Sequence, residues 1–179
     1  MKNSEQNLPV AEEKSNIADI SIIDTAQFVT FHYGKHFFGL PIDDVIEINK
    51  ALDITPVPMA PEYVSGVVNL RGQILTAIDL AKRIGLDTKD FQPRDSKELN
   101  NVIMGQREEP VSLLVESIGD VMSIPLEKIG PPPDMIEGIN LRYVSQVCKL
   151  DSKLLIILDS KALEQPEEKK NKGSAGSAN

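Results

Sequence analysis

The residues that could carry out covalent or metal chemistry are few in this chain. It has one cysteine, Cys148, and two histidines, His32 and His36, which lie four positions apart. A nucleophilic thiol needs a nearby base, and a metal site needs more than two ligands. The sequence offers no paired base, no nucleophile elbow and no third ligand beside the histidines. A cysteine- or histidine-dependent hydrolase therefore has little support, and we expect no enzymatic activity, no cofactor and no metal.

Two charged residues stand in patterns that suit recognition of another protein. Arg71 belongs to Asn69-Leu70-Arg71-Gly72, a polar, turn-forming segment between two apolar runs. Glu47 lies within Val45-Ile-Glu-Ile48. A guanidinium on a tight turn can grip a carboxylate or a backbone carbonyl of a partner. On pattern alone, however, both residues are more simply explained as solvated surface side chains.

An internal repeat shows how such residues would be positioned. The segment Tyr63 to Leu80 has a weaker copy at Tyr143 to Leu158, in which matching residues lie 80 positions apart. Upstream, Ile42 to Ile48 aligns with Val115 to Val121 at a spacing of 73. In this alignment Cys148 takes the place of Val68, which favours a small buried core residue over a reactive thiol. The sequence thus indicates a duplicated β unit, and partners could dock at the interface between the two copies.

The local patterns predict short strands separated by glycine- and proline-rich turns. A hairpin is expected around Gly34-Lys35, and further strands at 66–69, 73–78, 102–104, 111–115 and 153–158. Gly66 and Gly72 serve backbone geometry, since Gly72 can adopt positive φ in the turn while the Asn69 side chain bonds the turning backbone. Asp79 and Asp159 can each cap a short helix, over 80–84 and from 160 to about 168. This pattern favours an all-β fold of two small barrels, one for each copy.

The overall composition limits where in the cell the protein is expected and which classes of partner it can bind. The net charge is −8 and there is no tryptophan, so nucleic acid is a poor partner. No apolar run is long enough to insert into a membrane, and the start lacks a secretion signal, which predicts a cytoplasmic protein. We expect a flexible N-terminal arm over 1–24, a folded domain over 25–165 with a connector near 86–101, and a flexible tail over 166–179.

These residues resemble the CheW family of bacterial chemotaxis coupling proteins. The match covers about Ala26 to Leu163, and its most specific part is Gly66-Val-Val-Asn-Leu-Arg-Gly72 followed by Ile78-Asp79-Leu80. The resemblance implies two five-stranded SH3-like barrels packed side by side. It also implies a non-enzymatic adaptor that couples chemoreceptors (methyl-accepting chemotaxis proteins) to the histidine kinase CheA and scaffolds the signalling array.

The resemblance also implies where partners bind. Val45, Glu47, Ile48 and Arg71 match family positions for protein contact, whereas Gly66 and Gly72 match its structural glycines. The implied partners are the CheA regulatory domain, the cytoplasmic tip of a chemoreceptor and further CheW-like domains. The chain departs from the family pattern at Thr76, where proline is usual, and at Ser112 and Gln146, where glycines are common in the second barrel. One alternative stays open: a CheW-like module of a larger signalling protein, either the kinase's own regulatory domain or a receiver-fused coupling protein.

Overall fold

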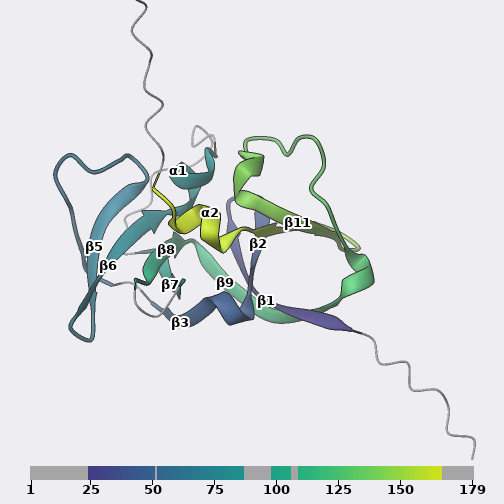
Figure 1. Ribbon diagram of the computed structural model, residues 1–179, viewed down its shortest axis with the longest axis horizontal. Helices are drawn as coiled ribbons and strands as arrows, with labels where there is room; N and C mark the ends of the chain where they lie inside the picture. Colours follow the sequence, from purple (N-terminus) through teal and green to yellow (C-terminus); the bar gives the residue numbers. More distant parts are fainter. Residues whose placement is uncertain (1–23, 51, 87–97, 106–108, 167–179) are drawn as a thin grey trace, which may run out of the picture.

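The computed structural model describes residues 24–50, 52–86, 98–105 and 109–166. The predicted N-terminal arm before residue 24, most of the predicted connector and the tail from residue 167 lie outside the described residues. The described chain is mainly β, with two sheets and a few short helices, as the sequence predicts. Figure 1 shows the two sheets side by side, with the helices α1 (Leu80–Ile84) and α2 (Ser160–Glu164) near the middle of the molecule.

Each sheet has six strands instead of the five expected from the family resemblance. The first sheet has the spatial order β10 (Ile129–Gly130), β11 (Val144–Lys149), β12 (Leu154–Leu158), β2 (His36–Pro41), β1 (Thr25–Tyr33) and β9 (Ser117–Pro125). The second has the order β3 (Val45–Asn49), β7 (Asn100–Met104), β8 (Val111–Val115), β6 (Gln73–Asp79), β5 (Val64–Leu70) and β4 (Ile54–Thr55). We call the two units lobe A and lobe B.

The internal repeat is visible in equivalent hydrogen bonds. The Asp79 amide donates to the Tyr63 carbonyl at 2.8 Å, and the Asp159 amide donates to the Tyr143 carbonyl at 2.9 Å. The Asp79 side chain accepts from the Lys82 amide, and that of Asp159 accepts from the Ala162 amide, so both predicted helix caps are confirmed. Helix α1 ends at Gly85 with φ of 77°, as predicted, whereas α2 stops at Glu164, before the predicted end near 168.

The two repeats do not form one barrel each, which corrects the expectation from the sequence. Repeat 1 runs from β1 to α1 and repeat 2 from β7 to α2, but each repeat places its first hairpin in the lobe of the other. The β1–β2 hairpin pairs with β9 and runs parallel to β12, while the β7–β8 hairpin pairs with β3 and β8 runs parallel to β6. Ser112, assigned to the second barrel by the resemblance, therefore lies in lobe B with β3.

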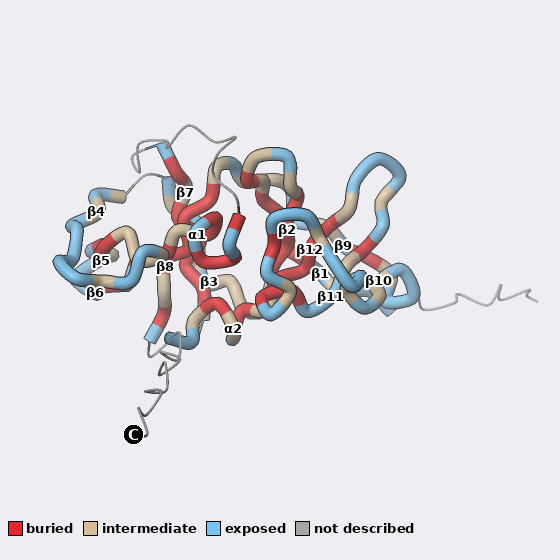
Figure 2. The backbone as a smooth tube through the Cα atoms, turned by 90° about the horizontal axis from the view of Figure 1, so that it is seen from above, coloured by how far each residue is buried: buried red, intermediate tan, exposed pale blue. Residues whose placement is uncertain are grey.

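Because each repeat places its first hairpin in the lobe of the other, the described part of the protein has three apolar cores. One small core fills each lobe, around Phe28 and Cys148 in lobe A and around Val68 and Leu75 in lobe B. The third and largest lies between the lobes, where side chains of both sheets meet, such as Phe38 of β2 and Leu113 of β8. Figure 2 shows buried chain continuing through the middle of the molecule. Burial of this shared core holds the lobes together.

A buried arginine lies beside the shared core. Arg83 of α1 is 2% exposed, and its guanidinium lies 4.1 Å from the ring centre of Tyr63 and 5.1 Å from that of Tyr143. Its Nε donates to the Leu163 carbonyl at 3.1 Å, and its Nη2 donates to the carbonyls of Ala162 and Gln165. Arg83 thus joins the two helices through carbonyls at the end of α2 and through the repeat-equivalent tyrosines.

The exchanged hairpins lead to a prediction about a divided chain. Because both lobes need strands from both repeats, residues 1–92 and 93–179 should bind each other as a 1:1 complex with native-like β signal. Neither half alone should unfold cooperatively. Co-expression, light scattering and circular dichroism of the complex and of each half test this. A cooperatively folded isolated half would show that the lobes fold independently.

Candidate functional site

The predicted contact residues on β3 differ in exposure. Ile46 and Ile48 are 45% and 41% exposed and face outward. Val45 and Glu47 alternate with them and are half-buried, and Val45 packs against the shared core. The sequence prediction of Val45, Glu47 and Ile48 therefore includes two half-buried residues and omits the exposed Ile46. Ile46 lies at a β-bulge, where the register with β7 shifts between Val45 and Glu47, and it is a second exposed apolar residue of the strand.

The β5–β6 hairpin carries Arg71 at its tip. Leu70 and Gln73 pair across the hairpin, which leaves Arg71 and Gly72 as a two-residue turn with φ of 52° and 90°. Two successive positive φ values are typical of a type I′ turn, whose twist matches that of the flanking strands. The Asn69 side chain accepts from the Gly72 amide at 2.8 Å, as the sequence predicts. Arg71 adopts this positive φ at the tip of the hairpin, and its side chain is mostly exposed.

Gly66 is not part of this turn. It lies at a bulge of β5, where the register shifts between Val64 and Gly66, and its φ is 148°. A Cβ at this position would lie 2.3 Å from the Thr55 carbonyl oxygen of β4. The glycine is therefore required for close approach of β4, not for the turn at Arg71.

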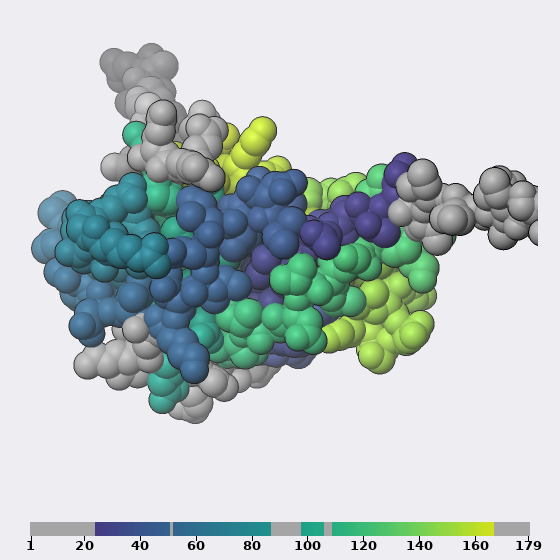
Figure 3. Space-filling model, turned by 90° about the horizontal axis from the view of Figure 1, so that it is seen from below, coloured from purple at the N-terminus to yellow at the C-terminus, as the bar shows by residue number. Residues whose placement is uncertain are grey.

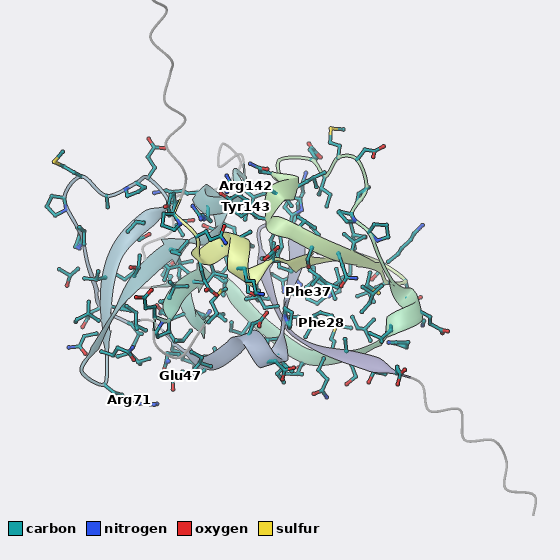
Figure 4. All side chains as sticks on the ribbon, viewed as in Figure 1. Phe28, Phe37, Glu47, Arg71, Arg142 and Tyr143 are labelled. Atoms are coloured by element: carbon teal, nitrogen blue, oxygen red, sulfur yellow. The ribbon has the colours of Figure 1, made fainter. Side chains whose placement is uncertain are left out.

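Glu47 and Arg71, which are far apart in the sequence, meet in the structure. The Arg71 Nη1 atom lies 3.0 Å from the Glu47 Oε2 atom, and the two side chains are 78% and 22% exposed. Glu47 Oε1 also accepts from the Asn49 side chain at 2.8 Å. Figure 4 shows Glu47 and Arg71 together at the lower edge of the molecule, on the side opposite Arg142 and Tyr143. Because Arg71 is so exposed, this ion pair contributes less than about 1 kcal/mol to folding.

The ion pair lies on a groove of about 540 Å³ in lobe B. Strand β3, the residue Asp43 before it and the hairpin supply one set of lining residues, whereas Ile103 of β7, Gly105 and Pro110 supply another. The lining residues are Asp43, Val45, Ile46, Glu47, Leu70, Arg71, Gln73, Ile103, Gly105 and Pro110. We call this the hairpin groove. In Figure 3 the blue atoms of the β3 region lie between the teal hairpin and the green atoms of β9.

A second groove of about 630 Å³ adjoins the first, since both are lined by Gln73 and Pro110. It lies over β6 and the start of β8, and it reaches Glu164 at the end of α2 and Pro166 beyond that helix. Burial, followed by the charges of Asp44 and Asp159, raises the pKa of Glu164. The Ser160 hydroxyl donates to Asp44 at 2.7 Å, which ties α2 to the 3₁₀ turn η1 (Ile42–Asp44) before β3.

The residues first considered for chemistry lie away from these grooves. Cys148 is buried and pairs with Ile129 of β10, just as Val68 pairs with Ile54 of β4, and burial raises the pKa of its thiol. His32 lies against the Phe37 ring at 4.6 Å between centres, and burial lowers the pKa of both histidines. Within the described ranges, no three or more His, Cys, Asp or Glu residues are grouped to hold a metal ion. In the same ranges, no helix has the length and apolar content to span a membrane.

Comparison with known proteins decides the family. The profile described as "CheW-like domain" matches residues 27–167. The chain belongs to the CheW family. The chemotaxis protein CheW of Treponema pallidum is 33% identical over 142 residues, covering 79% of this chain and 84% of that protein. The corresponding protein of Klebsiella aerogenes is 31% identical over 146 residues, covering 79% and 83%.

Solved structures agree with this assignment. The crystal structure of the scaffolding protein TtCheW from Thermoanaerobacter tengcongensis matches with a TM-score of 0.68 and 32% identity. The match covers 76% of this chain and 90% of TtCheW. Lobes A and B are therefore the two SH3-like subdomains of the CheW fold. Membership of the family makes the chain a non-enzymatic chemotaxis coupling and scaffolding protein.

The two glycines beside the site should respond differently to substitution. Gly66→Ala should lower the free energy of unfolding by about 3 kcal/mol, because the new methyl group must displace β4 as well as adopt a disfavoured φ. Gly72→Ala should cost only about 1 kcal/mol, since no atom lies within 4 Å of the added Cβ and only backbone strain remains. Urea unfolding of both variants measures the difference. Equal losses would contradict the close approach of β4.

The raised pKa of Glu164 predicts a pH-dependent stability. The folded protein holds the Glu164 proton more tightly than the unfolded chain, so this residue's contribution to stability falls as pH rises through the folded-state pKa. Glu164→Gln should therefore raise the free energy of unfolding at pH 7.5, and its advantage should shrink as pH falls toward 5. Urea unfolding across this range measures it. A constant difference for Glu164→Gln across this range would contradict the prediction.

Proposed function

We propose that this chain couples chemoreceptors to the histidine kinase CheA at receptor arrays in the cytoplasm, and that the hairpin groove is a docking surface for these partners. The observation that supports this most directly is the Glu47–Arg71 pair, which joins β3 to the hairpin tip while leaving Arg71 78% exposed. A guanidinium held in this way keeps donors available for a carboxylate or carbonyl of a partner.

The surroundings of the pair suit a helical or barrel-shaped protein partner. Ile46 supplies apolar area in the hairpin groove beside the charged pair, and Ile74 on β6, which is 61% exposed, supplies it in the adjoining groove. A few apolar anchors with a charged rim are typical of surfaces that bind an amphipathic helix or another domain. The CheA regulatory domain and the receptor tip are the partners that we assign to this surface, and further CheW-like domains are a third class.

Binding measurements with Arg71 variants test this function. Arg71→Ala should weaken binding to a purified receptor signalling tip or to the CheA regulatory domain by about tenfold or more, because a partner group loses its bidentate donor. Arg71→Lys should recover only part of the affinity, since it keeps the charge without the planar fork. Isothermal titration calorimetry with each partner gives both values.

Arg142 offers a matched control. It is also an exposed arginine, but it lies on the opposite side of the molecule (Figure 4), so Arg142→Ala should leave both affinities unchanged. Unfolding free energies of all variants should stay within about 1 kcal/mol of the parent protein. If the parent bound neither partner, or if Arg71→Ala changed neither affinity, the proposed function of the hairpin groove would be wrong.

A further inference from the structure

The topology has a consequence for how two copies of this chain can meet. Each lobe is complete only when strands of repeat 1 and repeat 2 pair, as β6 does with β8 and β12 with β2. The described repeats end at Leu86 and begin again at Glu98, so a single connector joins them. None of the strand pairings between repeats requires that both repeats come from one molecule.

A second copy can therefore supply the same contacts. Repeat 1 of one chain can pair with repeat 2 of another, and the reverse, so that two lobe pairs form from two chains. Such an exchange needs no new interface, because the ladders β1–β9, β3–β7, β6–β8 and β2–β12 are all preserved. The choice between one chain and two then depends on concentration and on the number of residues between Leu86 and Glu98.

The hairpin groove is built from both repeats. Glu47 and Arg71 belong to repeat 1, whereas Gly105 and Pro110 belong to repeat 2. In an exchanged dimer each groove would therefore contain residues of two chains, and each particle would carry two grooves. A particle with two grooves would bind a multivalent partner more tightly than a monomer, without any new contact.

We propose that this chain forms a strand-exchanged dimer with a second copy of itself, in which repeat 1 of each chain completes both lobes with repeat 2 of the other. The partner is recognised by the β6–β8 and β2–β12 ladders and by the shared core between the lobes. This dimer forms during folding, when the repeats of neighbouring chains are both unpaired. The proposal does not depend on what binds the hairpin groove.

A cross-link between chains gives the direct test. Thr76 of β6 and Val111 of β8 are direct partners in the parallel ladder, and Thr76 is exposed. One chain would carry Thr76→Cys and a second chain Val111→Cys, with the buried Cys148 replaced by alanine in both. The two chains are unfolded, mixed, refolded together at high concentration and oxidised with copper phenanthroline. We expect a disulfide-linked dimer of one chain of each kind on a non-reducing gel.

Three controls make this result specific. A single chain carrying both cysteines should form the same disulfide within a monomer, which checks the geometry. A Thr76→Cys chain refolded with a Gln73→Cys chain should give at most a trace of linked dimer, because both residues lie in repeat 1. Native monomers of the first two chains, mixed without unfolding, should also stay unlinked.

Light scattering of the refolded parent chain gives a second readout that needs no cysteine. Dimer formation is second order in protein, so refolding at tenfold higher concentration should raise the dimer-to-monomer ratio about tenfold. A chain lacking residues 88–96 of the connector should give more dimer than the parent at the same concentration. Only monomers under all these conditions, or dimers without the mixed 76–111 cross-link when the single-chain control forms it, would overturn the proposal.

Discussion

Parallel pairing between strands of different repeats is the constraint on which this structure depends. Strand β6 of repeat 1 lies against β8 of repeat 2, and β12 of repeat 2 lies against β2 of repeat 1. Parallel strands cannot be joined by a tight turn, so their pairing requires a long excursion of the chain. Here that excursion includes α1 and β7 between β6 and β8, and everything from β3 to β11 between β2 and β12. Lobe A is therefore discontinuous in sequence, lobe B runs from β3 to β8 but combines strands of both repeats, and the largest core lies between the lobes.

The pairing of strands from different repeats also sets the geometry of the candidate site. The β7–β8 hairpin of repeat 2 stands between β3 and β6 of repeat 1, and so sets the spacing between the strand that carries Glu47 and the hairpin that carries Arg71. Backbone ladders and buried side chains fix this spacing, whereas the ion pair itself adds little stability. The two charged groups are therefore positioned by the fold and remain available for exchange with groups of a partner.

Much of the local structure could be predicted from the sequence because it rests on short-range rules. The hairpin at Gly34-Lys35, the turn at Asn69 to Gly72 and the caps at Asp79 and Asp159 all follow from residue type and spacing, and the structure has each of them. Strand β9 was missed, because its exposed and half-buried residues interrupt the apolar alternation. The exchange of hairpins could not be predicted, since repeat similarity shows which segments are equivalent but not which of them pair.

The candidate site also depends on contacts between distant segments, which local sequence patterns do not reveal. Glu47 and Arg71 were each identified, but no local pattern reveals that residues 24 positions apart form a pair. Arg83 was missed because an arginine in a short helix is usually solvated, and only tertiary packing encloses it between Tyr63 and Tyr143. In the CheW family, as in other duplicated folds, residues at the seam have to be found from coordinates.

The enclosure of Arg83 also makes the two halves of this chain structurally unequal. The position equivalent to Arg83 in repeat 2 is Leu163, and these two residues touch where the helices meet. A tandem of two first halves would bring two guanidinium groups together in a site that excludes water. A tandem of two second halves would lack the buried guanidinium that joins the helices, although Arg142 would still lie over each Tyr143 ring. At this one pair of positions the structure therefore favours packing of unlike halves over packing of two identical halves.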